Sequence, residues 1–241
     1  MRQDDRAAEM TRQQHLTQYV CRARFARKGA LSFIGHLDLM KVFERAIRRA
    51  ELPILYTQGY NPRPMLVFAL PLGVGIDTTG DYVDAAMAVP VNAEEFMAKV
   101  NPELPQDLEV LSCISIDEPK RSLMSVVTYA EYEIEAPGIT EPALRLFARD
   151  EILMEKKNKK GKIVSTDIRP LMVKPFEDST ADKVHVLVSA GSVSNLRPDI
   201  FIRAVCIHEG YDPDKASEAV ITRTALFGGE YPDIEGIEGL V

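Results

Sequence analysis

The sequence predicts an α+β protein made of two ferredoxin-like units in tandem, each of the type strand–helix–strand–strand–helix–strand. Two observations lead to this fold class. Apolar alternating segments and amphipathic helical segments follow one another in that order twice. With 241 residues, the chain is also long enough for two modest hydrophobic cores. We therefore expect domains at 19–117 and 123–228, a flexible lead-in at 1–18 and a loose acidic tail at 229–241.

The expected first domain is dominated by a basic amphipathic helix within residues 32–50. Its apolar positions recur at three- and four-residue spacing, which buries one stripe of a helix; they are Leu39, Met40, Phe43, Ala46, Ile47 and Ala50. A second, shorter helix at 93–100 follows Asn92, a favourable N-cap residue. The strands expected in this domain lie at 19–26, 65–70, 82–89 and 108–116.

The expected second domain repeats this order with one extra or broken strand. A hairpin is predicted where 152–154 and 163–164 flank the basic segment KKNKKGK. The other elements expected here are strands at 126–135, 184–189 and 219–226 and helices at 141–150 and 198–209. Residues 117–123 between the domains are predicted to form a linker or lead-in segment.

Charge is unevenly distributed along the chain. The formal net charge is −7, yet residues 1–50 carry eleven Lys/Arg and five Asp/Glu, so their net charge is +6 and that of the remainder is −13. An acidic protein can still bind nucleic acid through a local basic face. No apolar run has the length of a membrane span, and residues 1–18 lack the hydrophobic core of a signal peptide, so we expect a cytoplasmic protein.

The three cysteines predict neither a disulfide framework nor a metal site. Cys21, Cys113 and Cys206 lie far apart in the sequence and form no CxxC pair. Zinc and iron–sulfur sites need clustered thiolate or imidazole ligands, and no such spacing occurs. We expect no metal and no cofactor in this chain.

The basic helix and the turn after it are the strongest candidate binding site. The turn Gln58–Pro64 contains two prolines that fix backbone angles and so pre-position Tyr60 and Arg63. Arginine and lysine contact phosphates, and tyrosine can stack on a base. The candidate nucleic-acid or anion-binding residues are His36, Lys41, Arg45, Arg48, Arg49, Gln58, Tyr60, Asn61, Arg63, Arg169 and Arg197. We expect the helix and the turn to share one concave surface.

Simpler interpretations stand beside these. His36 and Asp38 are two residues apart on a helix and point in different directions, so they form no acid–base dyad. Asp38 fits a helix-capping role, and His36 fits either a structural hydrogen bond or a ligand contact. Arg169 and Arg197 each precede a proline and could line a cleft or anchor the main chain. No metal triad, nucleophile elbow or carboxylate pair is present, so no catalytic residue is predicted.

Several of these segments together resemble one known family. They are Gly35-His36-Leu37-Asp38-Leu39-Met40, Gln58–Pro64, Pro71–Gly75, Asp167–Pro170 and Asn195–Pro198. They are similar to the bacterial radical SAM-linked (radical SAM-associated) domain family of unknown function, over roughly residues 19–228. The family's usual serine before the histidine is replaced by Gly35. The resemblance implies a radical SAM enzyme as partner, with the iron–sulfur cluster and SAM on that partner, and it supplies no activity.

The function expected from the sequence is therefore a non-catalytic accessory protein of a radical SAM enzyme. It would bind RNA or present a substrate through a basic cleft. Two alternatives remain open. The same helix could dock on the radical SAM partner as a protein–protein adaptor, or His36 and Arg63 could serve a small-molecule enzyme.

Overall fold

A computed structural model describes residues 19–157 and 161–240, and the chain divides into two compact units. The first unit contains the residues up to Val126 together with the segment that begins at Ile237, and the second runs from Val127 to Gly236. Each unit combines an antiparallel sheet with helices, so the predicted α+β class is confirmed. Within the described ranges, no helix is both long and apolar enough to cross a membrane.

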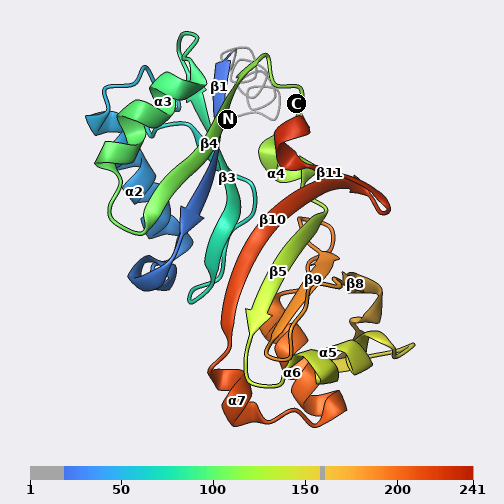
Figure 1. The fold of residues 1–241 in the computed structure, drawn as a ribbon. Coiled ribbons are helices and arrows are strands. Elements are labelled where there is room, and N and C mark those ends of the chain that lie inside the picture. The colour runs from blue at the N-terminus through green and yellow to red at the C-terminus, as the bar shows by residue number, and fades with distance from the viewer. Residues whose placement is uncertain (1–18, 158–160, 241) are drawn as a thin grey trace. The chain divides into compact units, whose positions relative to one another are not determined.

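The first unit is an antiparallel sheet in the order β4-β1-β3-β2, with α2 and α3 on one face (Figure 1). Its elements are β1 (Tyr19–Arg27), α2 (His36–Arg49), β2 (Leu66–Phe68), β3 (Asp77–Met87), α3 (Ala93–Val100), β4 (Leu108–Asp117) and the short helix α4 (Leu123–Val126). Short 3-10 turns lie at Gly29–Phe33 and Asn101–Glu103. The predicted basic amphipathic helix is α2.

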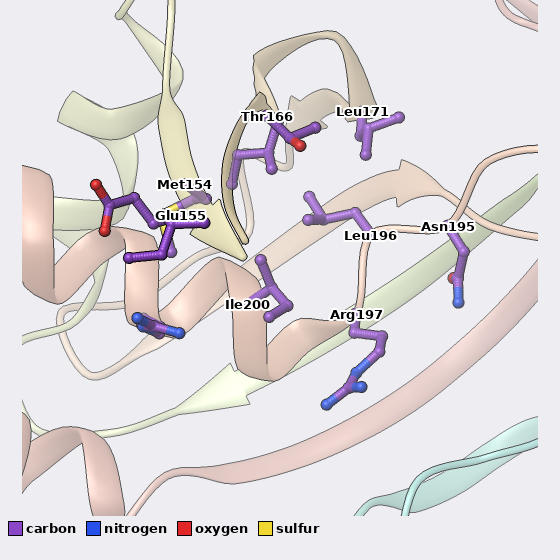
Figure 2. A pocket seen from close by; sticks show the side chains of 11 residues that line it. Met154, Glu155, Thr166, Leu171, Asn195, Leu196, Arg197 and Ile200 are labelled. Atoms are coloured by element: carbon purple, nitrogen blue, oxygen red, sulfur yellow. The ribbon is translucent and has the colours of Figure 1, made fainter. Parts of the chain in front are cut away.

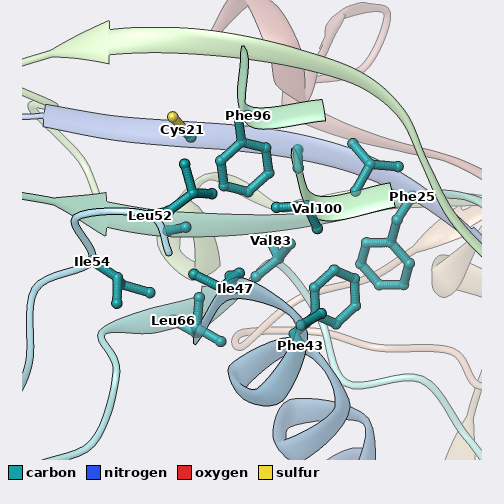
Figure 3. Packing of buried hydrophobic residues seen from close by; sticks show 14 of the residues in the cluster. Cys21, Phe25, Phe43, Ile47, Leu52, Ile54, Leu66, Val83, Phe96 and Val100 are labelled. Atoms are coloured by element: carbon teal, nitrogen blue, oxygen red, sulfur yellow. The ribbon is translucent and has the colours of Figure 1, made fainter. Parts of the chain in front are cut away.

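The core of the first unit lies between the sheet and α2 and α3. Alternate β1 side chains, among them Phe25, point to the helices, and the apolar stripe of α2 supplies Phe43 and Ile47 (Figure 3). The Phe43 ring packs edge-on against Phe25 and Phe68, with centroid distances of 5.1 and 5.5 Å. This packing fixes α2 over β1 and β2.

The opposite face of the first sheet is covered by the C-terminal segment. Arg22 of β1 is 1% exposed and makes two hydrogen bonds to the Asp84 carboxylate, from Nε at 2.8 Å and from Nη2 at 3.0 Å. Its Nη1 donates to the carbonyl oxygens of Ile237 (3.0 Å) and Leu240 (2.6 Å). Ile237 is fully buried. The guanidinium therefore ties residues 237–240 to the sheet.

The second unit has an antiparallel sheet in the order β10-β5-β9-β8, with β11 added to β10 (Figure 1). Its strands are β5 (Tyr129–Glu135), β6 (Leu153–Lys157), β7 (Ile163–Asp167), β8 (Met172–Pro175), β9 (Lys183–Ser189), β10 (Val220–Glu230) and β11 (Asp233–Gly236). The helices are α5 (Thr140–Phe147), α6 (Pro198–Glu209) and α7 (Pro213–Ser217). α5 and α6 pack through Phe147 and Phe201, whose ring centroids are 5.8 Å apart.

The strands β6 and β7 pair only with each other among the described residues, as the predicted hairpin requires. Residues 158–160 of its basic tip lie outside the described residues. The strand β8 was not predicted, because its four residues include Pro175 and show no strong alternation.

Two expectations about the ends of the domains differ from the structure. The segment predicted as a linker or lead-in at 117–123 leads into α4, whose Leu123 and Val126 are buried, and the first unit extends to Val126. The tail predicted to be loose is ordered by pairing and packing. β11 pairs with β10 from Phe227↔Gly236 to Glu230↔Asp233, and Arg22 holds the residues that follow. The acidic composition of the tail could not indicate that a buried arginine, Arg22, donates hydrogen bonds to the carbonyl groups of the tail.

We predict that Asp84→Ala lowers the free energy of unfolding by about 3–5 kcal/mol, because it leaves a buried guanidinium without its counter-ion. Urea denaturation of the purified variants measures the effect. The double variant Arg22→Met/Asp84→Leu removes both charges and is expected to cost less than Asp84→Ala. A double variant that is the least stable of the set would contradict this account of the pair.

Candidate functional site

Lys41, Arg45 and Arg48 form a stripe on the outer face of α2. Their spacing of four and three residues places them on one side of the helix, opposite the buried stripe. All three are exposed. Lys41 pairs with Asp38 at 3.1 Å, but both side chains are more than half exposed, so this pair contributes little. Within the described residues, Arg45 and Arg48 have no hydrogen bond or ion pair. We call these three residues the basic ridge.

Arg49 does not belong to the ridge. Its Nε lies 2.6 Å from Glu103 Oε2, and its Nη2 also donates to the Glu103 carbonyl oxygen. Glu103 follows α3 in a 3-10 turn, so Arg49 fastens the C-terminal end of α2 to that turn. An arginine whose charge is already balanced by a carboxylate has less to gain from a phosphate.

The Gln58–Pro64 turn protrudes from the edge of the first sheet. The residues before and after it are held by bridges from Ile54 to Met87 and from Tyr56 to Pro64. Thr57 N donates to the Arg63 carbonyl oxygen at 2.8 Å, and Arg63 N donates to Thr57 Oγ1 at 3.0 Å. These bonds close the base of the loop.

The tip of this loop is fully open to solvent. Tyr60 is 100% exposed, and Gln58, Asn61 and Arg63 are exposed too. Gly59 has φ +145°, a backbone conformation that a residue with a side chain rarely adopts. A fully exposed tyrosine cannot form part of a concave wall. The expectation of one concave surface shared by helix and turn is therefore wrong at Tyr60.

The C-terminal end of α2 lies near the start of β2, and the loop leads into β2. The N-terminal end of α2 is marked by His36, whose ring packs on Phe68 at the end of β2. Toward its C-terminal end, Ile47 lies beside Leu66 at the start of β2 (Figure 3). The basic ridge runs along α2 from Lys41 to Arg48 on the side opposite the buried stripe.

No contact joins His36 to Arg63 among the described residues. The ring of His36 packs on that of Phe68, with the ring centroids 5.2 Å apart. Arg63 lies five residues before Phe68, in the exposed loop.

The two candidate arginines of the second unit have different surroundings. Arg169 donates from Nε to the Arg149 carbonyl oxygen and from Nη1 to the Met172 carbonyl oxygen, both at 2.8 Å. These contacts favour the anchoring role for Arg169. Arg197, the N-cap residue of α6, is exposed and pairs with Asp199, with Nε 2.9 Å from Oδ1. Its backbone places it at the mouth of a pocket.

That pocket has a volume of about 660 Å³ and lies between the β6–β7 hairpin and α6 (Figure 2). Its lining residues are Met154, Glu155, Ile163, Thr166, Ile168, Leu171, Asn195, Leu196, Arg197, Ile200 and Arg203. Of these, sequence reasoning singled out only Arg197 as a site residue. Arg203 could have been found from the sequence. It lies three residues after Ile200 and six after Arg197, and this spacing places the three residues on one face of a helix. The opposite wall of the pocket is formed by the β6–β7 hairpin, and no local sequence pattern predicts that the hairpin packs beside α6.

The described residues contain no group of three or more His, Cys, Asp or Glu side chains placed to hold a metal ion. What the first unit offers is an exposed basic helix face and an exposed aromatic ring on a neighbouring segment of the chain.

A family described as "Uncharacterized protein conserved in bacteria (DUF2344)" matches residues 21–198, which is more than half of the chain. A search of curated proteins found no match.

We predict that His36 titrates below its ordinary pKa of 6.5, because burial disfavours the imidazolium and Arg27 repels it, with Asp81 opposing the shift. The unfolded chain then binds this proton more tightly than the folded one, so stability falls as pH drops through and below 6.5. Replacement by glutamine should flatten that pH dependence of the free energy of unfolding. An NMR titration of His36 with a midpoint above 6.5 would contradict the prediction.

Proposed function

The chain belongs to the bacterial family of uncharacterized proteins DUF2344, and from its own residues we propose that it is a non-catalytic, RNA-binding accessory protein of a radical SAM enzyme. The observation that carries the RNA-binding part is the basic ridge on α2 with Arg45 and Arg48 exposed and without ion pairs in the described part of the chain. Arginine side chains without internal carboxylate partners are available to phosphates. Tyr60, fully exposed on the loop that leads into β2, adds a stacking surface.

We further propose that both units are ferredoxin-like. In the first unit the chain order strand–helix–strand–strand–helix–strand goes with the sheet order β4-β1-β3-β2. In the second, the order β10-β5-β9-β8 is the same when β5, β8, β9 and β10 are counted as the four strands. The β6–β7 hairpin is then an insertion before the second strand. This support is topological and carries no function by itself.

The sheet faces favour the helix as the RNA surface. Many RNA-binding domains of this general type stack bases on the exposed face of the sheet. In the first unit that face is covered by residues 237–240, and Tyr82 Oη donates to Glu238 at 3.1 Å. In the second, the face carries Glu131 and Glu133, whose carboxylates lie 2.8 Å from His185 Nε2 and 2.9 Å from Lys183 Nζ. A covered face and a face of paired side chains both disfavour RNA, and this favours the outer face of α2.

The link to a radical SAM enzyme is supported by the sequence resemblance alone. The segment from Gly35 to Met40 forms the start of α2 and directly precedes the basic ridge, and the Gln58–Pro64 segment forms the protruding loop. In this proposal the cytoplasmic partner carries the iron–sulfur cluster and SAM, and this chain holds or presents the RNA. No residue of this chain is assigned a chemical step.

We predict that Arg45→Glu/Arg48→Glu abolishes retention of single-stranded RNA in a low-salt shift assay. In a milder variant, Arg45→Gln/Arg48→Gln, the slope of log K against log salt should fall by about 0.7 for each lost phosphate contact. Both side chains are exposed, so circular dichroism and the melting temperature should stay unchanged. Retention of RNA by the folded Glu double variant would refute the proposal that the basic ridge binds RNA.

The matched control is Lys120→Glu/Arg121→Glu. It changes the net charge by the same amount on exposed residues that follow β4, outside α2 and the loop. This control should keep RNA binding close to that of the parent protein. Equal losses in both double variants would mean that total charge, not the ridge, sets the affinity.

We predict that Tyr60→Ala weakens RNA binding by about 1–3 kcal/mol, the usual contribution of one stacked base, without loss of stability. The side chain is 100% exposed, so its removal leaves no cavity. Fluorescence anisotropy with a labelled oligonucleotide measures the change, and Tyr60→Phe is the control because it keeps the ring. A Phe variant that binds as weakly as the Ala variant would exclude stacking.

The adaptor alternative predicts a different purification. If the ridge docks on an acidic surface of the partner enzyme, that enzyme co-purifies in a salt-sensitive manner and the ratio of absorbance at 260 and 280 nm stays that of protein alone. An elevated ratio that falls after ribonuclease treatment supports RNA binding.

A further inference from the structure

We propose that the pocket between the β6–β7 hairpin and α6 binds a small organic anion with an apolar body. All of its lining residues belong to the second unit. The inference is therefore independent of the basic ridge on α2, and either can fail without the other.

The floor of the pocket is apolar. Leu196, Ile168 and Met154 are 1%, 5% and 5% exposed, and they line the pocket together with Ile200. Figure 2 shows Leu196, Met154 and Ile200 around a common space. Ile163 on the hairpin also lines this space while 62% of its surface is exposed. The nearly buried floor residues shape the pocket, and the exposed surface of Ile163 is the kind of apolar surface that a ligand body covers.

The size of the pocket fits a small molecule. Its volume of about 660 Å³ lies within the usual range for ligand sites, which is roughly 300–1,000 Å³. A polypeptide partner would normally need a larger and flatter surface.

Polar groups lie around the rim and favour a single negative charge on the ligand. Arg203 is exposed and has no hydrogen bond or ion pair within the described residues, whereas Arg197 is already paired with Asp199. Glu155 lies on the far side from Arg197 and Asn195 (Figure 2). A guanidinium without an ion pair among the described residues therefore lines the same pocket as the apolar floor. This combination suits a carboxylate, sulfonate or phosphate joined to an aromatic or branched aliphatic body.

Asn195 and Thr166 can orient such a ligand. Neither side chain has a hydrogen bond to another described residue, so the amide of Asn195 and the hydroxyl of Thr166 are available as donors and acceptors. They lie on different walls, on the segment before α6 and on β7. A few polar groups placed around an apolar floor are typical of a specific small-molecule site.

The test uses two probes that differ only in charge. 1-Anilinonaphthalene-8-sulfonate has an aromatic body and one sulfonate, and N-phenyl-1-naphthylamine has the same body without it. We expect saturable binding of the sulfonate probe with one site per chain, measured by fluorescence and by calorimetry on the full-length protein. Arg203→Gln should weaken that probe about tenfold, the effect of one lost charged hydrogen bond, and leave the neutral probe within about twofold.

Two variants close the pocket from opposite walls. Ile200→Glu places a charge on the floor, and Thr166→Trp fills the space from β7, where Thr166 is exposed and a larger side chain does not disturb the core. Each should abolish saturable binding of both probes. Because the two substitutions lie on separate elements, misfolding of one leaves the other as a test. Melting curves identify such a failure, and a misfolded chain would bind more sulfonate probe, not less.

The control variant is Lys215→Gln on α7. It removes one exposed positive charge of the second unit outside the pocket and should leave binding of both probes unchanged. Absence of saturable binding, or equal binding of the sulfonate probe by the parent, Ile200→Glu and Thr166→Trp proteins, would overturn the proposal. If Arg203→Gln weakened binding of both probes equally, the inference that the ligand is an anion would be overturned.

Discussion

The buried guanidinium of Arg22 is the interaction on which the first unit depends. A charge that is 1% exposed must have its donors satisfied, and here the acceptors come from β3 and from the last described residues of the chain. Burial raises the pKa of Asp84, while its hydrogen bonds to Arg22 oppose the shift. Such a pair adds little net stability, but removing one member is costly. Its main consequence is specificity, because it fixes where the C-terminal segment lies.

That fixed segment decides which surfaces are left for binding. With residues 237–240 over one face of the first sheet and α2 and α3 over the other, exposed charge remains on the outer side of the helices and on loops. The exposed face of the second sheet is occupied by a polar network instead. Glu131 accepts a hydrogen bond from Thr224 Oγ1 at 2.7 Å, and His185 Nε2 lies 2.8 Å from the same oxygen. In each unit, the candidate binding site therefore lies outside the sheet: the basic ridge on α2 in the first unit and the pocket beside α6 in the second.

Within the first unit, the candidate residues divide according to their neighbours. Arg45 and Arg48 keep their charge available, whereas Arg49, one position further along α2, is engaged by Glu103. The sequence predicted that all four basic residues of this helix bind anions, and the spacing of the residues could not distinguish these two environments. The neutral state favoured for His36 likewise depends on Phe68 and Arg27, which are distant in sequence. A neutral imidazole can donate one hydrogen bond, but it adds no positive charge to the ridge.

The sequence by itself determined the α+β class, the buried stripe and basic face of α2, and the strands of the β6–β7 hairpin, because helix and strand periodicities are local properties. Tertiary structure alone decided that Arg49 has an ion-pair partner while Arg45 and Arg48 have none among the described residues. It also decided that Tyr60 protrudes and that the acidic tail is packed at Ile237. It also brought Arg203 and Thr166 to one pocket from separate elements. These outcomes depend on contacts between residues far apart in the chain, and no local pattern of residue types records such contacts.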